Sequence, residues 1–79
     1  MKLQKAIALR ISNLMRLNNY SQYELSKRST VEQSTIFHIL NEDTKHIKIQ
    51  TIFKIADAFN LSLKEFFDDN LFDKTNIEI

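Results

Sequence analysis

The sequence predicts an all-α fold, and three observations lead to this prediction. Apolar residues recur at three- and four-residue steps through most of the chain, the spacing of a helix with one buried face. The 79 residues include no Gly and no Pro, so the usual sequence signals of a β-hairpin are absent. Two Ser-x-x-Glu sequences begin at Ser21 and Ser62, and a capping box of this kind opens a helix. A chain of this length forms one small domain.

The apolar spacing divides the chain into five helical segments. The expected segments are 2–18, two short helices within 21–40, 49–59, and a fifth helix that opens at Ser62 and contains Phe66 and Phe67. The buried stripe of the first segment is expected to be Leu3, Ile7, Ile11, Leu14 and Leu17 or Asn18. In the fourth segment the apolar positions, which include Ile49 and Phe53, are too dense for an exposed face. Asn18-Asn19-Tyr20 ends the first segment and offers an Asn for the left-handed conformation that Gly usually adopts at a helix end, and Asn60 can do the same for the fourth.

The stretch from Ser21 to Leu40 has an unusual polar face. Between its core positions it carries Gln33, Ser34 and Thr35, with His38 one turn further on. A solvated helix face would normally carry Glu, Lys and Arg instead. Amide, hydroxyl and imidazole groups suit the base edges in a DNA major groove, where each base pair shows its own pattern of donors and acceptors.

The spacing of this stretch resembles the helix-turn-helix of the lambda-repressor-like (Cro/CI-type, XRE) family. The residues that carry the resemblance are Ser21-Gln22, Leu25-Ser26, Thr30-Val31 and Ser34-Thr35-Ile36, followed by blocks at 52–59 and 61–67 that resemble the family's fourth and fifth helices. The resemblance covers roughly Ile7 to Asp68. It implies a compact five-helix domain whose second and third helices form the helix-turn-helix. It also implies a sequence-specific transcriptional regulator that inserts its third helix into the major groove of an operator as a homodimer, with repression as the expected role.

The expected DNA contacts form two groups. Candidate base contacts are Gln33, Ser34, Thr35, Phe37 and His38; candidate phosphate contacts are Ser21, Gln22, Asn41, Thr44, Lys45 and Lys48. The amide of Gln33 can pair with adenine, and His38 can donate to guanine or reach a phosphate. In the family, a Gln at the place of Gln22 binds a phosphate. Phe37 fits either a thymine methyl or sugar, or packing under the following loop, and Thr30 stands where the family commonly has Gly.

The expected domain organisation is a DNA-binding domain over 1–69 and a tail over 70–79. The tail keeps four apolar residues, Leu71, Phe72, Ile77 and Ile79, although a free terminus is usually polar. This indicates docking, either on the same domain or on a second copy of the chain. The expected dimer interface comprises Phe66, Leu71, Phe72, Ile77 and Ile79.

The charge is unevenly distributed along the chain. Residues 1–48 hold eight Lys and Arg against four Asp and Glu, whereas residues 49–79 hold three against six. The net charges are therefore +4 and −3. Such a domain can turn its basic part toward phosphates and its acidic part away from them.

Composition also argues against other functions. The chain has no Cys and only two His, so we expect no disulfide, no metal site and no cofactor. No Gly-rich phosphate loop is present, so we expect neither catalysis nor a small-molecule substrate. No apolar run approaches a membrane span, so a cytoplasmic protein is expected. The alternative function is a protein-interaction module of the same fold, an antitoxin or adaptor, in which Phe37 and the apolar tail hold a partner; RNA binding is a weaker third possibility.

Overall fold

The computed structural model describes residues 1–78, and Ile79, one of the expected interface residues, lies outside them. The described residues form helices and no strand, which confirms the all-α prediction. The elements are α1 (Leu3–Asn18), α2 (Gln22–Ser29), α3 (Gln33–Leu40), α4 (Ile49–Ala58), α5 (Leu63–Phe67) and a short 3-10 helix, η1 (Asn70–Phe72).

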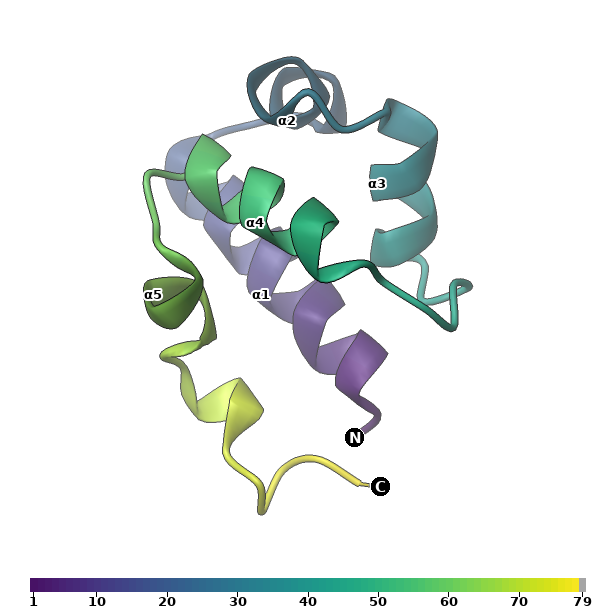
Figure 1. Cartoon of the computed structure of the whole chain (residues 1–79), viewed down its shortest axis with the longest axis vertical. Coiled ribbons are helices and arrows are strands. Elements are labelled where there is room, and N and C mark those ends of the chain that lie inside the picture. The colour runs from purple at the N-terminus through teal and green to yellow at the C-terminus, as the bar shows by residue number, and fades with distance from the viewer. Residues whose placement is uncertain (79) are drawn as a thin grey trace.

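Helix α1 is the central element of the fold. Figure 1 shows α4 lying across α1, with α3 on one side of the pair and α5 on the other, and α2 above them. Ile11, Leu25, Ile36, Ile55 and Phe66 come from the five different helices and are almost completely buried against one another. The single core therefore fixes the position of α2 and α3 relative to the rest of the chain.

The ends of the α1 stripe are exposed, in contrast to the prediction. Ile7, Ile11 and Leu14 are buried as expected, but Leu3 is 49% exposed and Leu17 is 79% exposed. The elements that pack on α1 cover only its middle, so periodicity alone overestimates the length of the buried stripe. The prediction that the fourth segment has no exposed apolar face was also wrong at two positions. Ile49 and Phe53 of α4 are 62% and 52% exposed, because they lie outside the helix face that packs on the core.

The chain turns without glycine by placing other residues in the left-handed region. Asn19, Thr30, Glu42 and Asn60 have φ angles of 56°, 61°, 59° and 60°. Asn60 is the helix-ending residue that the sequence predicted, and Asn19 is one of the two adjacent asparagines expected to end the first helix. At Asn19, the N–H groups of Asn19 and Tyr20 donate to the carbonyls of Arg16 and Met15, the paired bonds of a Schellman motif.

The two predicted capping boxes differ. At Ser62 the box is complete: the Glu65 N–H donates to Ser62 Oγ, and the Ser62 N–H donates to Glu65 Oε1. At Ser21 only half is formed, because the Glu24 N–H donates to Ser21 Oγ but the Glu24 carboxylate binds the Nε of Arg28 at 2.8 Å. A basic residue one turn later competes for the carboxylate.

The C-terminal segment docks on its own chain. Phe72 of η1 packs against the rings of Phe66 and Phe67, and the N–H of Glu78 donates to the carbonyl of Met1. Phe66 was an expected dimer contact, and that prediction was wrong: its side chain is 0% exposed and fills the core between α1 and η1. Leu71, Phe72 and Ile77 are half-buried.

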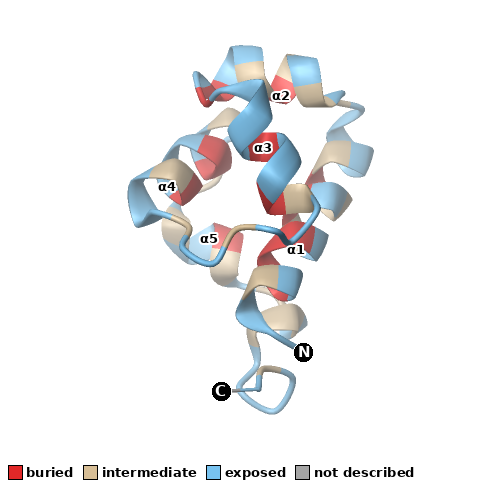
Figure 2. Cartoon of the chain, turned by 90° about the vertical axis from the view of Figure 1, so that its right-hand side faces the viewer, coloured by how far each residue is buried: buried red, intermediate tan, exposed pale blue. Residues whose placement is uncertain are grey.

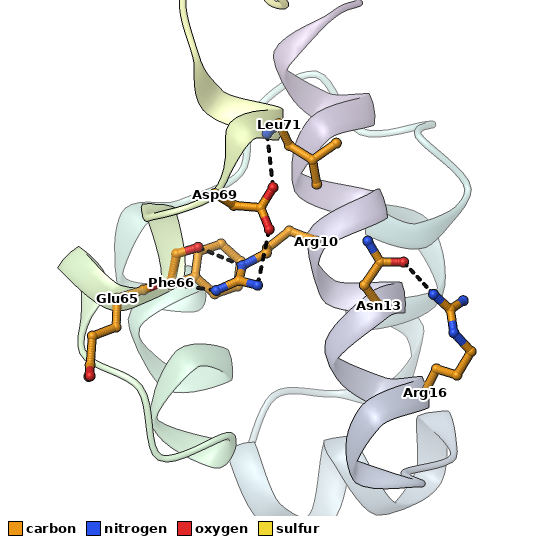
Figure 3. Close-up of polar contacts among 7 residues, drawn as sticks. All are labelled: Arg10, Asn13, Arg16, Glu65, Phe66, Asp69 and Leu71. Atoms are coloured by element: carbon orange, nitrogen blue, oxygen red, sulfur yellow. Dashed lines mark hydrogen bonds and ion pairs between the residues drawn. The ribbon is translucent and has the colours of Figure 1, made fainter.

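Arg10 of α1 ties α1 to this segment, as Figure 3 shows. Its guanidinium donates to the carbonyls of Phe66 and Glu65 and forms an ion pair with Asp69 at 3.3 Å. The Asp69 carboxylate also accepts a bond from the Leu71 N–H at the start of η1. One side chain thus holds the end of α5 and the start of η1 together against α1.

Candidate nucleic-acid interface

Helix α3 divides into a buried and an exposed face. Ile36 and Ile39 are 1% and 2% exposed and point into the core. All five candidate base-contact residues, Gln33, Ser34, Thr35, Phe37 and His38, are exposed. Because residues three and four apart share a helix face, burial of Ile36 and Ile39 turns the polar positions outward. Figure 2 shows this surface of α3 toward the viewer and largely exposed.

The turn between α2 and α3, residues 30–32, is held by two serines. Ser26 Oγ donates to the carbonyl of Val31 at 2.6 Å, and the Val31 N–H donates to Ser29 Oγ at 3.1 Å. The sequence placed Ser26 among the residues that carry the family resemblance, and it gave no role to Ser29, a polar side chain that is buried. The short Ser-x-x-Ser spacing within α2 is the signal that could have indicated this bracing. The two bonds fix the angle at which α3 leaves α2.

Thr30 turns the chain between the two helices. Its φ of 61° lies in the left-handed region, where a β-branched residue is strained. The Thr30 N–H closes α2 by donating to the carbonyl of Ser26, and its hydroxyl donates to the carbonyl of Ser29. The backbone of the turn therefore has the conformation that glycine would adopt, and Thr30 carries the strain of a β-branched residue in that conformation.

The candidate phosphate contacts flank α3. In Figure 2, α2, which begins just after Ser21, lies above α3, and the loop of residues 41–48 lies below it. Three of the six candidates already use a side-chain group within the chain: Ser21 caps α2, Asn41 donates to the carbonyl of Phe37, and Thr44 donates to the carbonyl of His46.

The other three phosphate candidates are Gln22, Lys45 and Lys48. Gln22 is half-buried at the first position of α2, and the two lysines are exposed. Within residues 1–78, neither lysine forms an ion pair. Their ammonium groups are thus available to an approaching phosphate.

An open groove of about 500 Å³ runs beside the exposed face of α3. Its lining includes Thr35 and His38 of α3 and, at the start of α4, Lys48 and Thr51. It brings the candidate base contacts and the cation at the end of the loop into one continuous surface. Asp43 also borders this groove and pairs with His38.

The acidic part of the chain lies away from this surface. Asp68, Asp69 and Asp73 cluster around α5 and η1. In Figure 1 this segment lies on the opposite side of α1 from α3. The exposed amide and hydroxyl face of α3 and its separation from the acidic cluster are features of a helix-turn-helix domain.

Comparison with known families agrees with this class. The family model for the Cro/C1-type HTH DNA-binding domain matches residues 10–71, and the chain belongs to this family. The predicted resemblance is thereby confirmed, and the protein is a regulator that binds double-stranded DNA. Neither the curated proteins nor the solved structures contained a match to the chain.

Two features are absent from the described residues. Residues 1–78 contain no group of three or more His, Asp or Glu side chains placed to hold a metal ion. No helix within the same residues has the length and apolar character needed to cross a membrane.

Proposed function

We propose that the protein is a sequence-specific transcriptional repressor whose α3 enters the major groove of an operator. The observation that carries this proposal is the outward face of α3, where Gln33, Ser34 and His38 are exposed together. Each can donate or accept hydrogen bonds to base edges. Gln22, Lys45 and Lys48 on the flanking segments then contact phosphates and set the register of α3 on the duplex.

We further propose that the protein acts as a homodimer. Leu71, Phe72 and Ile77 of the docked tail keep part of their apolar surface exposed. A two-fold axis through this region would let the α3 of each subunit reach one of two successive half-sites. Such half-sites lie about 34 Å apart, one helical turn of DNA. The interface excludes Phe66, which the core has already buried.

Selection from random duplexes tests this function. Purified protein should enrich a symmetric sequence, and its affinity for that sequence should fall steeply with salt as counterions return to the phosphates. A protein that makes 6–10 phosphate contacts loses about 10³–10⁵ in affinity between 50 and 200 mM salt. Equilibrium sedimentation of the complex gives the number of subunits per duplex. Failure to enrich any sequence, with a weak salt dependence, would rule out operator binding.

The protein-interaction module remains a second candidate because Phe37 is 49% exposed in the middle of the α3 face. An exposed aromatic ring of this size suits a protein partner as well as a thymine methyl. Binding to a protein centred on Phe37 would depend little on salt, whereas operator binding depends on it strongly. Phe37→Ser would then abolish partner binding and leave the salt dependence of duplex binding unchanged.

A further inference from the structure

The turn that ends α3 places an acidic residue beside a candidate base-contact residue. Glu42 adopts a φ of 59°, and the N–H groups of Glu42 and Asp43 donate to the carbonyls of Ile39 and His38. This is the bond pattern of a Schellman motif. It returns the chain toward the last turn of α3, so Asp43 is held next to His38 by the backbone.

The side chains of these two residues are also bonded. His38 Nδ1 lies 2.9 Å from Oδ1 and 3.0 Å from Oδ2 of Asp43. An ionised carboxylate only accepts hydrogen bonds, so the proton of this contact resides on Nδ1. In an uncharged imidazole the other nitrogen, Nε2, then carries a lone pair and acts as an acceptor.

The imidazole is held in place on two sides. The ring of Phe37 meets it edge to face with centroids 5.5 Å apart, and Asp43 holds Nδ1. The His38 side chain is nevertheless 55% exposed, and its Nε2 has no hydrogen-bond partner among residues 1–78. Nε2, which is the acceptor when the ring is uncharged and Nδ1 carries the proton, therefore belongs to the same exposed face as Gln33 and Ser34.

We propose that Asp43 is a positioning residue that determines the specificity of His38. It holds the imidazole with the proton on Nδ1, so that Nε2 accepts a hydrogen bond from the amino group of adenine or cytosine in the major groove. Guanine and thymine present only acceptors there, at N7 and O6 or at O4, and are disfavoured. This inference rests on the proposed function, and it replaces the sequence-based expectation that His38 donates to guanine.

A purely structural role for the pair explains less. Asp43 and His38 are 50% and 55% exposed, and ion pairs this exposed contribute little to stability. A carboxylate near the duplex also weakens binding to every phosphate. The unfavourable charge of Asp43 at this place is explained if its hydrogen bond to His38 determines which base His38 recognises.

The first test needs no DNA. Nitrogen chemical shifts of the His38 ring, measured by NMR at about pH 8, where an imidazole is ordinarily uncharged, distinguish the two tautomers. We expect protonated Nδ1 in the wild type and a shift toward protonated Nε2 in Asp43→Ala. His46 serves as an internal reference whose signal stays unchanged. Protonated Nε2 as the main form in the wild type would overturn the proposal.

The second test measures base preference. With the selected duplex, each position is changed in turn, and the position at which His38→Ala removes discrimination identifies the base that His38 reads. Wild type should prefer adenine or cytosine over guanine or thymine there by roughly 2- to 10-fold, the value of one hydrogen bond. Asp43→Ala should lose this preference at that position and keep the preferences at all others.

Glu42→Gln is the matched control. It removes one carboxylate from the same turn without touching His38, and it should raise affinity for all sequences while keeping the base preference. If Asp43→Ala behaves like Glu42→Gln, Asp43 acts only through charge and the proposal is wrong. If the wild type binds no duplex, the proposed function fails and the specificity role fails with it, whereas the NMR result still reports independently on the Asp43 contact.

Discussion

The Nε of Arg10 donates a hydrogen bond of 2.7 Å to the carbonyl oxygen of Phe66, although 56 residues separate them. The same guanidinium lies 5.8 Å from the centroid of the Phe66 ring. Its side chain is 14% exposed. Arg10 thus donates to two carbonyls in the last turn of α5, where a helix leaves its carbonyls without partners of its own, and α5 in turn covers the core.

Replacing Arg10 should therefore destabilise the domain. Arg10→Met keeps an apolar stem but removes the donor to the Phe66 carbonyl. It also removes one donor each from the Glu65 carbonyl and the Asp69 carboxylate, which keep the N–H groups of Asp68 and Leu71, respectively. We expect a loss of about 2–3 kcal/mol in the free energy of unfolding, measured by urea denaturation. Arg16→Met is the control, because the Arg16 side chain is exposed and, among residues 1–78, bonds only to the Asn13 side chain. Equal effects at both positions would contradict the anchoring role of Arg10.

The strained turn of the helix-turn-helix predicts a stabilising change. Thr30 has a φ of 61°, and removing its side chain relieves the clash that a β-branched residue suffers there. Thr30→Gly should raise the free energy of unfolding by about 0.5–1 kcal/mol, after the greater flexibility of Gly in the unfolded chain is counted. Ser12→Gly, at an exposed position within α1, should instead lower it by about 0.5 kcal/mol. A loss of stability in Thr30→Gly would show that the turn is not strained.

The complete capping box at α5 makes stability depend on pH in acid. The Ser62 N–H, and less strongly the Ser62 side chain, hold the pKa of Glu65 below its ordinary value of 4.5. The unfolded chain binds the Glu65 proton more readily than the folded chain does. The ionised Glu65 therefore adds to the free energy of unfolding, and this stabilisation is fully present above pH 4.5. It is lost as the pH falls from there through the lower pKa of the folded state.

Glu65→Gln isolates this contribution. Gln can still close a capping box but does not titrate. The difference in stability between the wild type and Glu65→Gln should shrink as the pH is lowered below 4.5, as followed by thermal unfolding at a series of pH values. Glu32→Gln, whose carboxylate accepts no hydrogen bond from any described residue, is the control and should leave the acid dependence nearly unchanged. A pH-independent difference for Glu65→Gln would refute the prediction.

Two glutamines should affect DNA binding in different ways. Gln33 is exposed at the start of α3, and its amide can pair with adenine, so Gln33→Ala should cost about 1–3 kcal/mol at one base pair and relax specificity there. Gln22 lies at the start of α2, and Gln22→Ala should weaken binding to all sequences alike. Titration of a panel of single-base operator variants separates the two effects. Unchanged specificity in Gln33→Ala would reject direct reading by that side chain.

Local patterns in the sequence were sufficient to predict the helices and most of the residues at which they begin and end. Capping by Ser62 and the left-handed turns at Asn19 and Asn60 depend on atoms within a few residues, which is why the sequence predicts them. The outward face of α3 follows from the positions of Ile36 and Ile39 for the same reason. The resemblance to the family rests on several such blocks at matching separations, and the family model over residues 10–71 confirms it.

Contacts between segments that are distant in the sequence decided which side chains are buried and which groups they bond to. The sequence indicates that Phe66 is apolar, but whether it faces a partner or the core depends on α1 and η1, which pack on it from opposite ends of the chain. Arg10 could equally have met solvent or phosphate until the end of α5 was placed beside it. The turn at Glu42 likewise brought Asp43 to Nδ1 of His38, a contact that the sequence did not indicate. Sequence thus determined which residues form helices and which faces are apolar, because those follow from local bonding and periodicity. Tertiary structure alone decided which groups meet across the core and the turns, because burial and hydrogen-bond partners are properties of packed neighbours.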